Sequence, residues 1–410
     1  MNQKNQNNQN VNSENMNAVP VKKNKNVRVW QEGAAVKITT GELGGAVARE
    51  GFVASLGGAG MTPDELEREM RIAREISPDG EIGVNLMYVA KDFHSLARVV
   101  KKLNANFIVL SAGYDSKILN FAGEYEDLKG LEIIPKVAHP SLALRVLQSG
   151  VVKRIMLEGA GCGGHIGFSS IKNFVSTEDL VKQTFIRFAT HLAKQVLGKG
   201  APEKEVEAFI EDIRKHREDY RVKYHVPELI AAGGINEDNF QQIIDSGADH
   251  IANCLIFTIC KESNAHVNWK TMQFQADRRI IFESPVKGML GSAIKNDFIE
   301  KYFELDETGV YRFKATEKNR PQGGEKIKPP FVDYCATKCM EHDFCLKYSK
   351  DYLHPMCIFH RLEETALAGN VGDGIVFTSE NLNYIQKVAR VNITAKEVID
   401  HIKKYTYGAC

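Results

Sequence analysis

The 410-residue chain lacks a long apolar segment, a surplus of charge of either sign and a dense set of cysteines. No apolar run reaches the ~18 residues of a transmembrane helix, and the first residues show neither the apolar core nor the cleavage site of a secretory signal. The 53 basic and 52 acidic side chains give a net charge of +1, so nothing indicates a nucleic-acid-binding surface. Eight cysteines are too few for a disulfide scaffold. We expect a cytoplasmic protein with a small-molecule substrate and without nucleic-acid or membrane partners.

Residues 1–26 are a low-complexity segment. Thirteen of these 26 residues are Asn or Gln, and apolar residues are sparse. Such a segment cannot bury enough surface to offset the entropy lost on ordering, so we expect a disordered tail.

From about residue 34 to 260, short apolar runs alternate with amphipathic stretches such as 64–76 and 141–149. Strand-then-helix repetition implies a parallel sheet, and eight units over ~230 residues suit a (β/α)8 TIM barrel. A doubly wound α/β sheet is the alternative. The expected strands are 35–38, 52–56, 82–87, 107–110, 133–138, 154–157, 229–232 and 251–255.

Two regions exceed this repeat. Residues 168–227 have helical patterns and many opposite charges four residues apart, which indicates a helical insertion after the sixth strand. The chain after the eighth strand has more helical pattern and a charged linker near 317–330. We therefore expect a barrel domain over 27–300 and a helical, cysteine-containing extension over 301–410 that packs on it.

A glycine-rich loop follows the sixth predicted strand. It reads Glu158-Gly-Ala-Gly-Cys-Gly-Gly-His165-Ile-Gly167, with five glycines around one histidine. Glycines let the backbone approach a flat ligand closely, and a histidine has a pKa suited to proton transfer near neutrality. Barrel active sites lie at this end of the strands, so the loop is a candidate catalytic site.

Three further positions have the character of a binding site. Gly233 and Gly234 end the seventh predicted strand, where barrels often hold a phosphate through backbone N–H groups. Asn85 is polar within an apolar strand run and needs either a ligand or a structural partner. Lys136 lies within a strand, where it must face either a carboxylate such as Glu158 or an anionic ligand.

Half of the cysteines fall within 23 residues. Four thiolates can ligate a tetrahedral zinc or an iron–sulfur cluster, and the irregular spacing with a long final gap favours the cluster. Buried free thiols are the alternative reading. The candidate metal ligands are Cys335, Cys339, Cys345 and Cys357.

Together these motifs resemble the nitronate monooxygenase (2-nitropropane dioxygenase) family, and most closely its long bacterial form with a cysteine-containing C-terminal tail. The resemblance runs from about Gln31 to Ile402 and implies an FMN-dependent TIM-barrel oxidoreductase. Flavin-type enoyl-acyl-carrier-protein reductases share the barrel and the Gly-Gly-His loop. The matching stretches are 31–40, 43–48, 83–87, 158–168, 231–235, 283–286, 293–296, 335–358 and 372–377.

The resemblance implies a role for each residue. His165 would be the catalytic base, Lys136 would lie near the flavin pyrimidine edge, and Asn85 would bond the isoalloxazine ring. Gly233 and Gly234 would hold the phosphate. The implied cofactor-binding residues are Ala34, Asn85, Lys136, Gly163, Gly164, Gly233, Gly234, Asn253 and Cys254.

Two stretches depart from the family pattern. Glu32-Gly-Ala-Ala stands where the family has Gly-Gly-Met-Gly, and Asn253-Cys-Leu-Ile-Phe stands where it has Met-Gly-Thr-Arg-Phe. Leu255 cannot supply the hydroxyl of that threonine, although Lys37 would offset the loss if its ammonium reached the phosphate.

Three hypotheses follow. The first is an FMN-dependent enzyme that oxidises alkyl nitronates or similar acidic carbon compounds. The second is an enoyl-thioester or quinone reductase that uses NAD(P)H. The third is a flavin-free descendant that acts as a binding or regulatory protein. A homodimer is the assembly that we expect.

Overall fold

The computed structural model describes residues 26–88, 90, 92–112, 125–284, 289–314, 357–390 and 392–408. The predicted disordered tail therefore lies outside the described residues, except for Asn26. Cys335, Cys339 and Cys345 of the predicted metal site also lie outside them.

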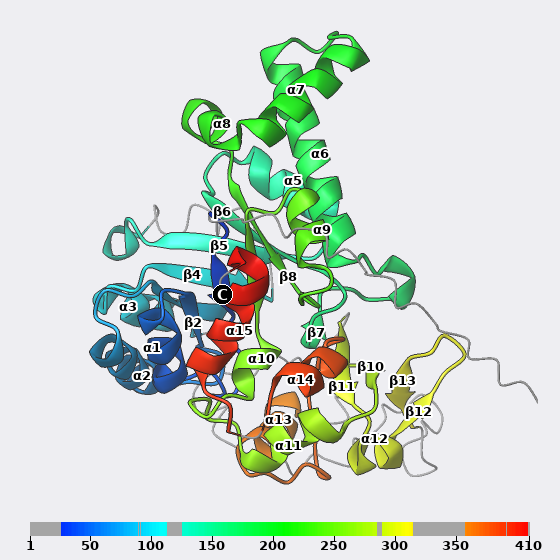
Figure 1. The fold of residues 1–410 in the computed structure, drawn as a ribbon. Helices are drawn as coiled ribbons and strands as arrows, with labels where there is room; N and C mark the ends of the chain where they lie inside the picture. Colours follow the sequence, from blue (N-terminus) through cyan, green and yellow to red (C-terminus); the bar gives the residue numbers. More distant parts are fainter. Residues whose placement is uncertain are drawn as a thin grey trace, which may run out of the picture.

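Eight parallel strands close into a barrel, which confirms the predicted TIM barrel and excludes the doubly wound sheet (Figure 1). The ring closes where Gln31 of the first strand pairs with Asn253 of the last. The barrel strands in order are β1 (Val29–Gln31), β2 (Val53–Gly57), β3 (Ile82–Met87), β4 (Phe107–Ser111), β5 (Glu132–Val137), β6 (Arg154–Glu158), β8 (Glu228–Ala232) and β9 (His250–Asn253).

The predicted first strand is wrong. Residues 35–38 form a turn after β1, in which Val36 and Lys37 have φ angles of +51° and +61°. A strand cannot contain this left-handed backbone. Val36 and Ile38 are buried all the same. The apolar run therefore marks a buried loop rather than a strand.

A ring of helices surrounds the barrel, and the last helix of the chain completes it. That helix, α15 (Ala395–Tyr407), packs on α1, and its Tyr405 ring lies 5.5 Å from the Phe240 ring of α9. The Tyr407 hydroxyl donates to the Val27 carbonyl at 2.8 Å, next to β1. Helix α15 thus occupies the eighth helical position, far in sequence from β9 (Figure 1). The earlier members of the ring are α1 (Gly41–Arg49), α2 (Pro63–Ile76), α3 (Phe93–Lys102), η2 (Glu126–Leu128), α5 (Pro140–Gln148), α6 (Thr177–Val196) and α9 (Phe240–Asp245).

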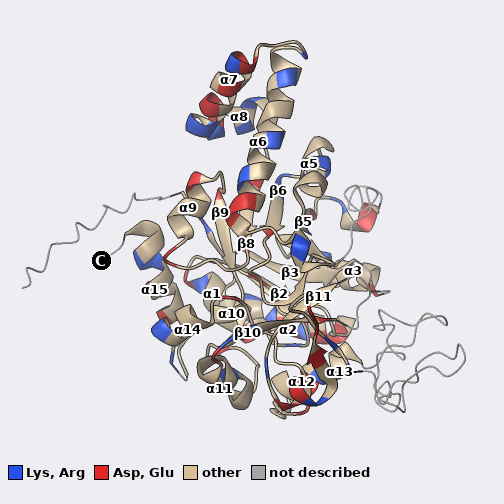
Figure 2. Ribbon diagram, turned by 90° about the vertical axis from the view of Figure 1, so that its right-hand side faces the viewer, with Lys and Arg blue, Asp and Glu red and all other residues tan. Residues whose placement is uncertain are grey.

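The predicted helical insertion after the sixth barrel strand is confirmed. Helix α6 continues into α7 (Glu203–Lys215) and α8 (Arg217–Tyr224), which project from the barrel (Figure 1) and carry charges of both signs (Figure 2). Arg217 anchors this arm, because its guanidinium lies 2.9 Å from Asp249 at the start of β9.

A second, five-stranded sheet lies beside the barrel, where the sequence indicated only helices. Its order is β12-β13-β10-β11-β7, so the short strand β7 (Gly164–Ile166) of the glycine-rich loop pairs with β11. This sheet ties the loop to the C-terminal third of the chain. The remaining elements are η3 (Ile171–Asn173), α10 (Leu255–Thr258), α11 (Val267–Gln275), β10 (Arg279–Glu283), β11 (Leu290–Ile294), α12 (Asp297–Tyr302), β12 (Phe303–Leu305), β13 (Tyr311–Phe313), α13 (Ile358–Ala366) and α14 (Leu382–Val388).

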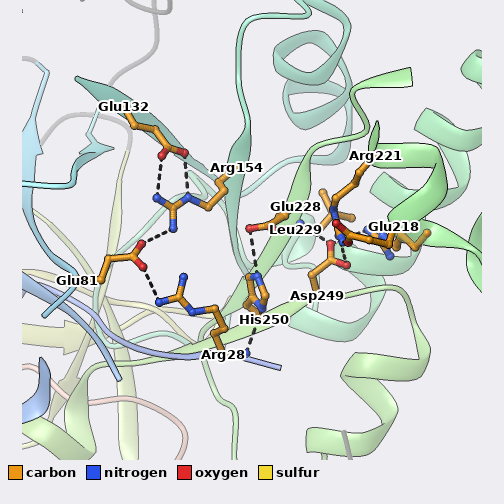
Figure 3. Close-up of polar contacts among 11 residues, drawn as sticks. Arg28, Glu81, Glu132, Arg154, Glu218, Arg221, Glu228, Leu229, Asp249 and His250 are labelled. Atoms are coloured by element: carbon orange, nitrogen blue, oxygen red, sulfur yellow. Dashed lines mark hydrogen bonds and ion pairs between the residues drawn. The ribbon is translucent and has the colours of Figure 1, made fainter. Parts of the chain in front are cut away.

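Ion pairs close the end of the barrel at which the strands begin (Figure 3). Arg154 donates to both oxygens of Glu132, at 2.9 and 2.8 Å, and to Glu81 at 2.7 Å. Arg28 donates to the second oxygen of Glu81. Two guanidinium groups and two carboxylates therefore balance each other here. None of the helices among the described residues is both long and apolar enough to cross a bilayer.

Candidate active site

A cavity of about 620 Å³ lies where the carboxyl ends of the barrel strands meet the C-terminal helices. This is the end of the barrel where catalytic residues of TIM-barrel enzymes lie. Trp269 of α11, Leu362 of α13 and Tyr384 of α14 cover it. The predicted catalytic and cofactor-binding residues all line this one cavity: Ala34, Asn85, Lys136, Gly163, Gly164, His165, Gly233, Gly234, Asn253 and Cys254.

His165 is held in the cavity by the second sheet. Its backbone pairs with Gly291 of β11, and its Nε2 lies 2.6 Å from the Ser284 hydroxyl. The Phe377 ring meets the imidazole edge to face at 5.3 Å. Sequence reasoning gave no role to Ser284 or Phe377, although both lie in the stretches that carry the family resemblance. The missing signal was the pairing of β7 with β11, which joins residues far apart in the chain.

Gly233 and Gly234 form a turn that only glycine can make. Their φ angles are +91° and +70°, and a Cβ on Gly234 would lie 1.9 Å from a carboxylate oxygen of Glu380. Among the described residues, neither N–H has a hydrogen-bond acceptor. Consecutive free N–H groups in such a turn suit an anionic oxygen.

The amide of Asn85 has structural partners. Its nitrogen donates to the Gly33 carbonyl at 2.9 Å, and its oxygen accepts from the Ser111 hydroxyl at 2.7 Å. These bonds tie the end of β3 to β4 and to the turn after β1. Asn85 therefore has hydrogen-bond partners for both ends of its amide within an apolar strand, and these partners fix the orientation of the side chain at the cavity.

A buried ion-pair cluster forms the floor of the cavity. The Lys136 ammonium lies 2.9 Å from Glu158 and 3.2 Å from Glu32, with side chains that are 12%, 14% and 9% exposed. Burial alone would lower the pKa of Lys136, but the two carboxylates raise it above its ordinary value. Burial raises the pKa of Glu158 despite the ammonium beside it.

Two thiols line the cavity close to this cluster. Burial raises the pKa of Cys254 to about 12 and that of Cys162 well above its ordinary value, so both are protonated and weakly nucleophilic near neutral pH. Leu255 also lines the cavity, as the first residue of α10. The expectation for Lys37 is wrong, because its ammonium pairs with Glu65 at 2.8 Å and the residue does not line the cavity.

The predicted metal site is described at one ligand only. Cys357 immediately precedes α13 and is half-buried. In the described ranges, no group of three or more His, Cys, Asp and Glu side chains is arranged to hold a metal ion. The four-cysteine site stays a prediction that rests on the other three cysteines.

Comparisons with known proteins give a family match and structural neighbours with the same fold. The family model for nitronate monooxygenase matches residues 21–402. A structure of FabK from Thermotoga maritima is 18% identical, covers 93% of each chain and has a TM-score of 0.61. The structure of a nitroalkane oxidase from Streptomyces ansochromogenes is 14% identical, covers 93% of this chain and 95% of its own, and has a TM-score of 0.59. No curated protein gives a significant match.

Proposed function

This chain belongs to the nitronate monooxygenase family of oxidoreductases, and on that premise we propose that it oxidises a small nitroalkane or its nitronate with FMN as cofactor. The observation that carries the proposal is the shared cavity: His165 and the Gly233–Gly234 turn line the same space at the carboxyl ends of the strands. A nitroalkane oxidase has the same fold, which is consistent with this substrate class.

The residues present fit a flavin mononucleotide. The cavity lies in the ~300–1,000 Å³ range of cofactor sites and has mostly apolar walls, as a flat ring requires. The free N–H groups of Gly233 and Gly234 would hold the phosphate. Asn85 and the glycines of the His165 loop would contact the ring system. When bound, the flavin would supply the acceptor for the electrons of the substrate.

His165 would act on the substrate as a base. A carbon next to a nitro group carries an acidic proton, and the imidazole that lines the cavity would take it. The Ser284 hydroxyl, 2.6 Å from Nε2, fixes the orientation of the ring. Phe377 contacts the imidazole, and residues of the C-terminal helices line the same cavity.

The test is the variant His165→Asn, assayed with nitroethane and with preformed ethyl nitronate. Turnover of neutral nitroethane should fall by ~10²-fold or more, because the proton has no acceptor. Ethyl nitronate needs no proton removed, so its oxidation should suffer less. Flavin content, measured by absorbance near ~450 nm, should be unchanged. His191→Asn is the matched control, since His191 lies on α6 against Gln148, outside the cavity.

Three outcomes would contradict the proposal. Equal losses on both substrates would mean that His165 only positions the ligand. Turnover of an enoyl thioester with NAD(P)H, and none of nitroethane, would favour the reductase hypothesis, an activity that FabK represents among the structural neighbours. Colourless protein that refuses added FMN would favour the flavin-free hypothesis. Iron, sulfide and zinc analysis of the same preparation tests the proposed cluster at Cys335, Cys339, Cys345 and Cys357.

A further inference from the structure

We propose that the cavity selects a neutral substrate over an anionic one, and that Glu32 is the residue that sets this selectivity. The inference rests on the proposed function and adds the charge state in which the substrate enters. Applied to a nitro compound, it means that the enzyme takes up the neutral nitroalkane rather than the nitronate anion.

The first support is the composition of the cavity floor. One ammonium, on Lys136, lies between the carboxylates of Glu32 and Glu158, and all three side chains are at least 86% buried. With both carboxylates ionised, the cluster has a formal charge of minus one. With a proton on one of them, the charge is zero. In neither state does the cluster have a net positive charge that could attract an anionic ligand.

The second support is that other cations near the cavity are already paired. Among the described residues that line it, Lys136 is the only Lys or Arg. Lys37 lies next to the lining residues but pairs with Glu65. Arg279 donates to the Ala160 carbonyl at 2.6 Å and lies 3.6 Å from Glu380. With the N–H groups of Gly233 and Gly234 assigned to the FMN phosphate, a second anion that entered would therefore meet a negative or neutral floor.

Glu32, rather than Glu158, carries the excess charge. Glu158 accepts a hydrogen bond from Lys136 at 2.9 Å. The Oε1 atom of Glu32 is 3.2 Å from the same ammonium, yet it is fully buried and accepts no hydrogen bond. Removing the Glu32 charge would leave the Lys136–Glu158 pair intact and balanced. The sequence analysis had noted Glu32 only as a departure from the family pattern.

The size of the effect follows from simple electrostatics. A unit charge ~8 Å from a ligand charge, at an effective dielectric constant near 20, changes binding on the order of tenfold or more. A proton on Glu158, whose pKa burial raises, would remove one unit of this negative charge. A neutral nitroalkane would enter unopposed, and His165 would remove its proton inside the cavity.

The experiment compares two unreactive ligands of equal size, propionamide and propionate, by calorimetric titration of the flavin-loaded protein. The wild type should bind the amide about tenfold more tightly than the carboxylate. In Glu32→Gln this ratio should fall several-fold, through tighter carboxylate binding. Glu67→Gln is the matched control, because it removes a carboxylate that pairs with Arg71 and Lys102 on the surface and does not line the cavity. Its ratio should equal that of the wild type.

The same proteins are then assayed with nitroethane and ethyl nitronate. Glu32→Gln should raise kcat/KM for the nitronate relative to nitroethane by the same factor. If Glu32→Gln fails to fold, Glu32→Leu removes the same charge, leaves the Lys136–Glu158 pair in place and should shift the ligand ratio in the same direction. A wild type that binds propionate as tightly as propionamide would overturn the inference, as would an unchanged ratio in the folded variants. Failure to oxidise either nitro compound would count against the proposed function alone, since the ligand ratio is measured without turnover.

Discussion

Both ends of the barrel contain buried charged side chains, but the charges are balanced at one end and unbalanced at the other. Where the strands begin, two guanidinium groups and two carboxylates, on Arg28, Arg154, Glu81 and Glu132, satisfy one another (Figure 3). Where the strands end, one ammonium faces two carboxylates next to a cavity. In the first arrangement every charge has a partner of opposite sign. The second leaves charge unbalanced, which costs stability and is useful only if a ligand or a proton responds to it.

The largest change in stability is expected at the end of the barrel where the strands begin. Arg154→Met would leave Glu81 and Glu132 partly buried without their shared partner, which should lower the free energy of unfolding by about 3–5 kcal/mol. Urea denaturation measures the loss. Arg98→Met is the control, because its pair with Asp127 is half exposed on both sides and should contribute less than about 1 kcal/mol. Similar losses in the two variants would show that the buried network is no more stabilising than a surface pair.

A second effect is expected at the open end, and in binding rather than in stability. Replacing Cys254 by Gly and Leu255 by Thr would restore a close backbone approach and a hydroxyl at the start of α10. Each recovered hydrogen bond to a phosphate oxygen is worth about 1.5–3 kcal/mol, or roughly tenfold in FMN affinity. Quenching of flavin fluorescence measures this affinity. Riboflavin is the control, because it lacks the phosphate and should bind the variant and the wild type equally. Equal gains for both flavins, or none, would place the phosphate elsewhere.

The smallest effect concerns pH, and the two ends should respond with opposite sign. Burial alone would raise the pKa of Glu81, but hydrogen bonds from Arg154 and Arg28 lower it below its ordinary 4.5. Glu81 therefore stabilises the fold above pH 4.5, and this stability is lost as the pH falls through its lowered pKa. Burial raises the pKa of Glu158 from 4.5, so its contribution becomes unfavourable as the pH rises above that value.

Unfolding free energies at about pH 7 and about pH 4 measure this difference. Relative to the wild type, Glu81→Gln should lose stability at the higher pH and less at the lower one. Glu158→Gln also removes a partner of Lys136, so it should lose stability at both pH values, but less at the higher one. Two variants with parallel pH profiles would contradict the contrast between the ends.

Much of the barrel was predictable from the sequence because each strand and helix there is local. Seven of the eight strands follow from short apolar runs, and the loop with His165 follows from its glycines. The first strand was missed because Val29–Gln31 is only three residues long, while the neighbouring run at 35–38 is apolar for a different reason. Its residues are buried in the turn that borders the cavity.

The cover of the site was not predictable in the same way. Phe377 and Tyr384 line the cavity and Ser284 contacts His165, all from segments that are distant in sequence. No local periodicity encodes such contacts. Glu32 stood out in the sequence only as a mismatch with a family pattern, and its pairing with Lys136 required the closed barrel to bring β1 and β5 together at the floor of the cavity.

The place of α15 in the ring has a consequence for how the protein is made. A ribosome releases all eight barrel strands, and then α11, α13 and α14, before it releases the residues of α15. Until then, nothing covers the groove between α1 and α9. In the finished molecule this groove is filled by α15, whose apolar residues Val398, Ile399 and Ile402 are fully buried. The sheet can close early in synthesis, but its outer wall is completed last, by the far end of the same chain.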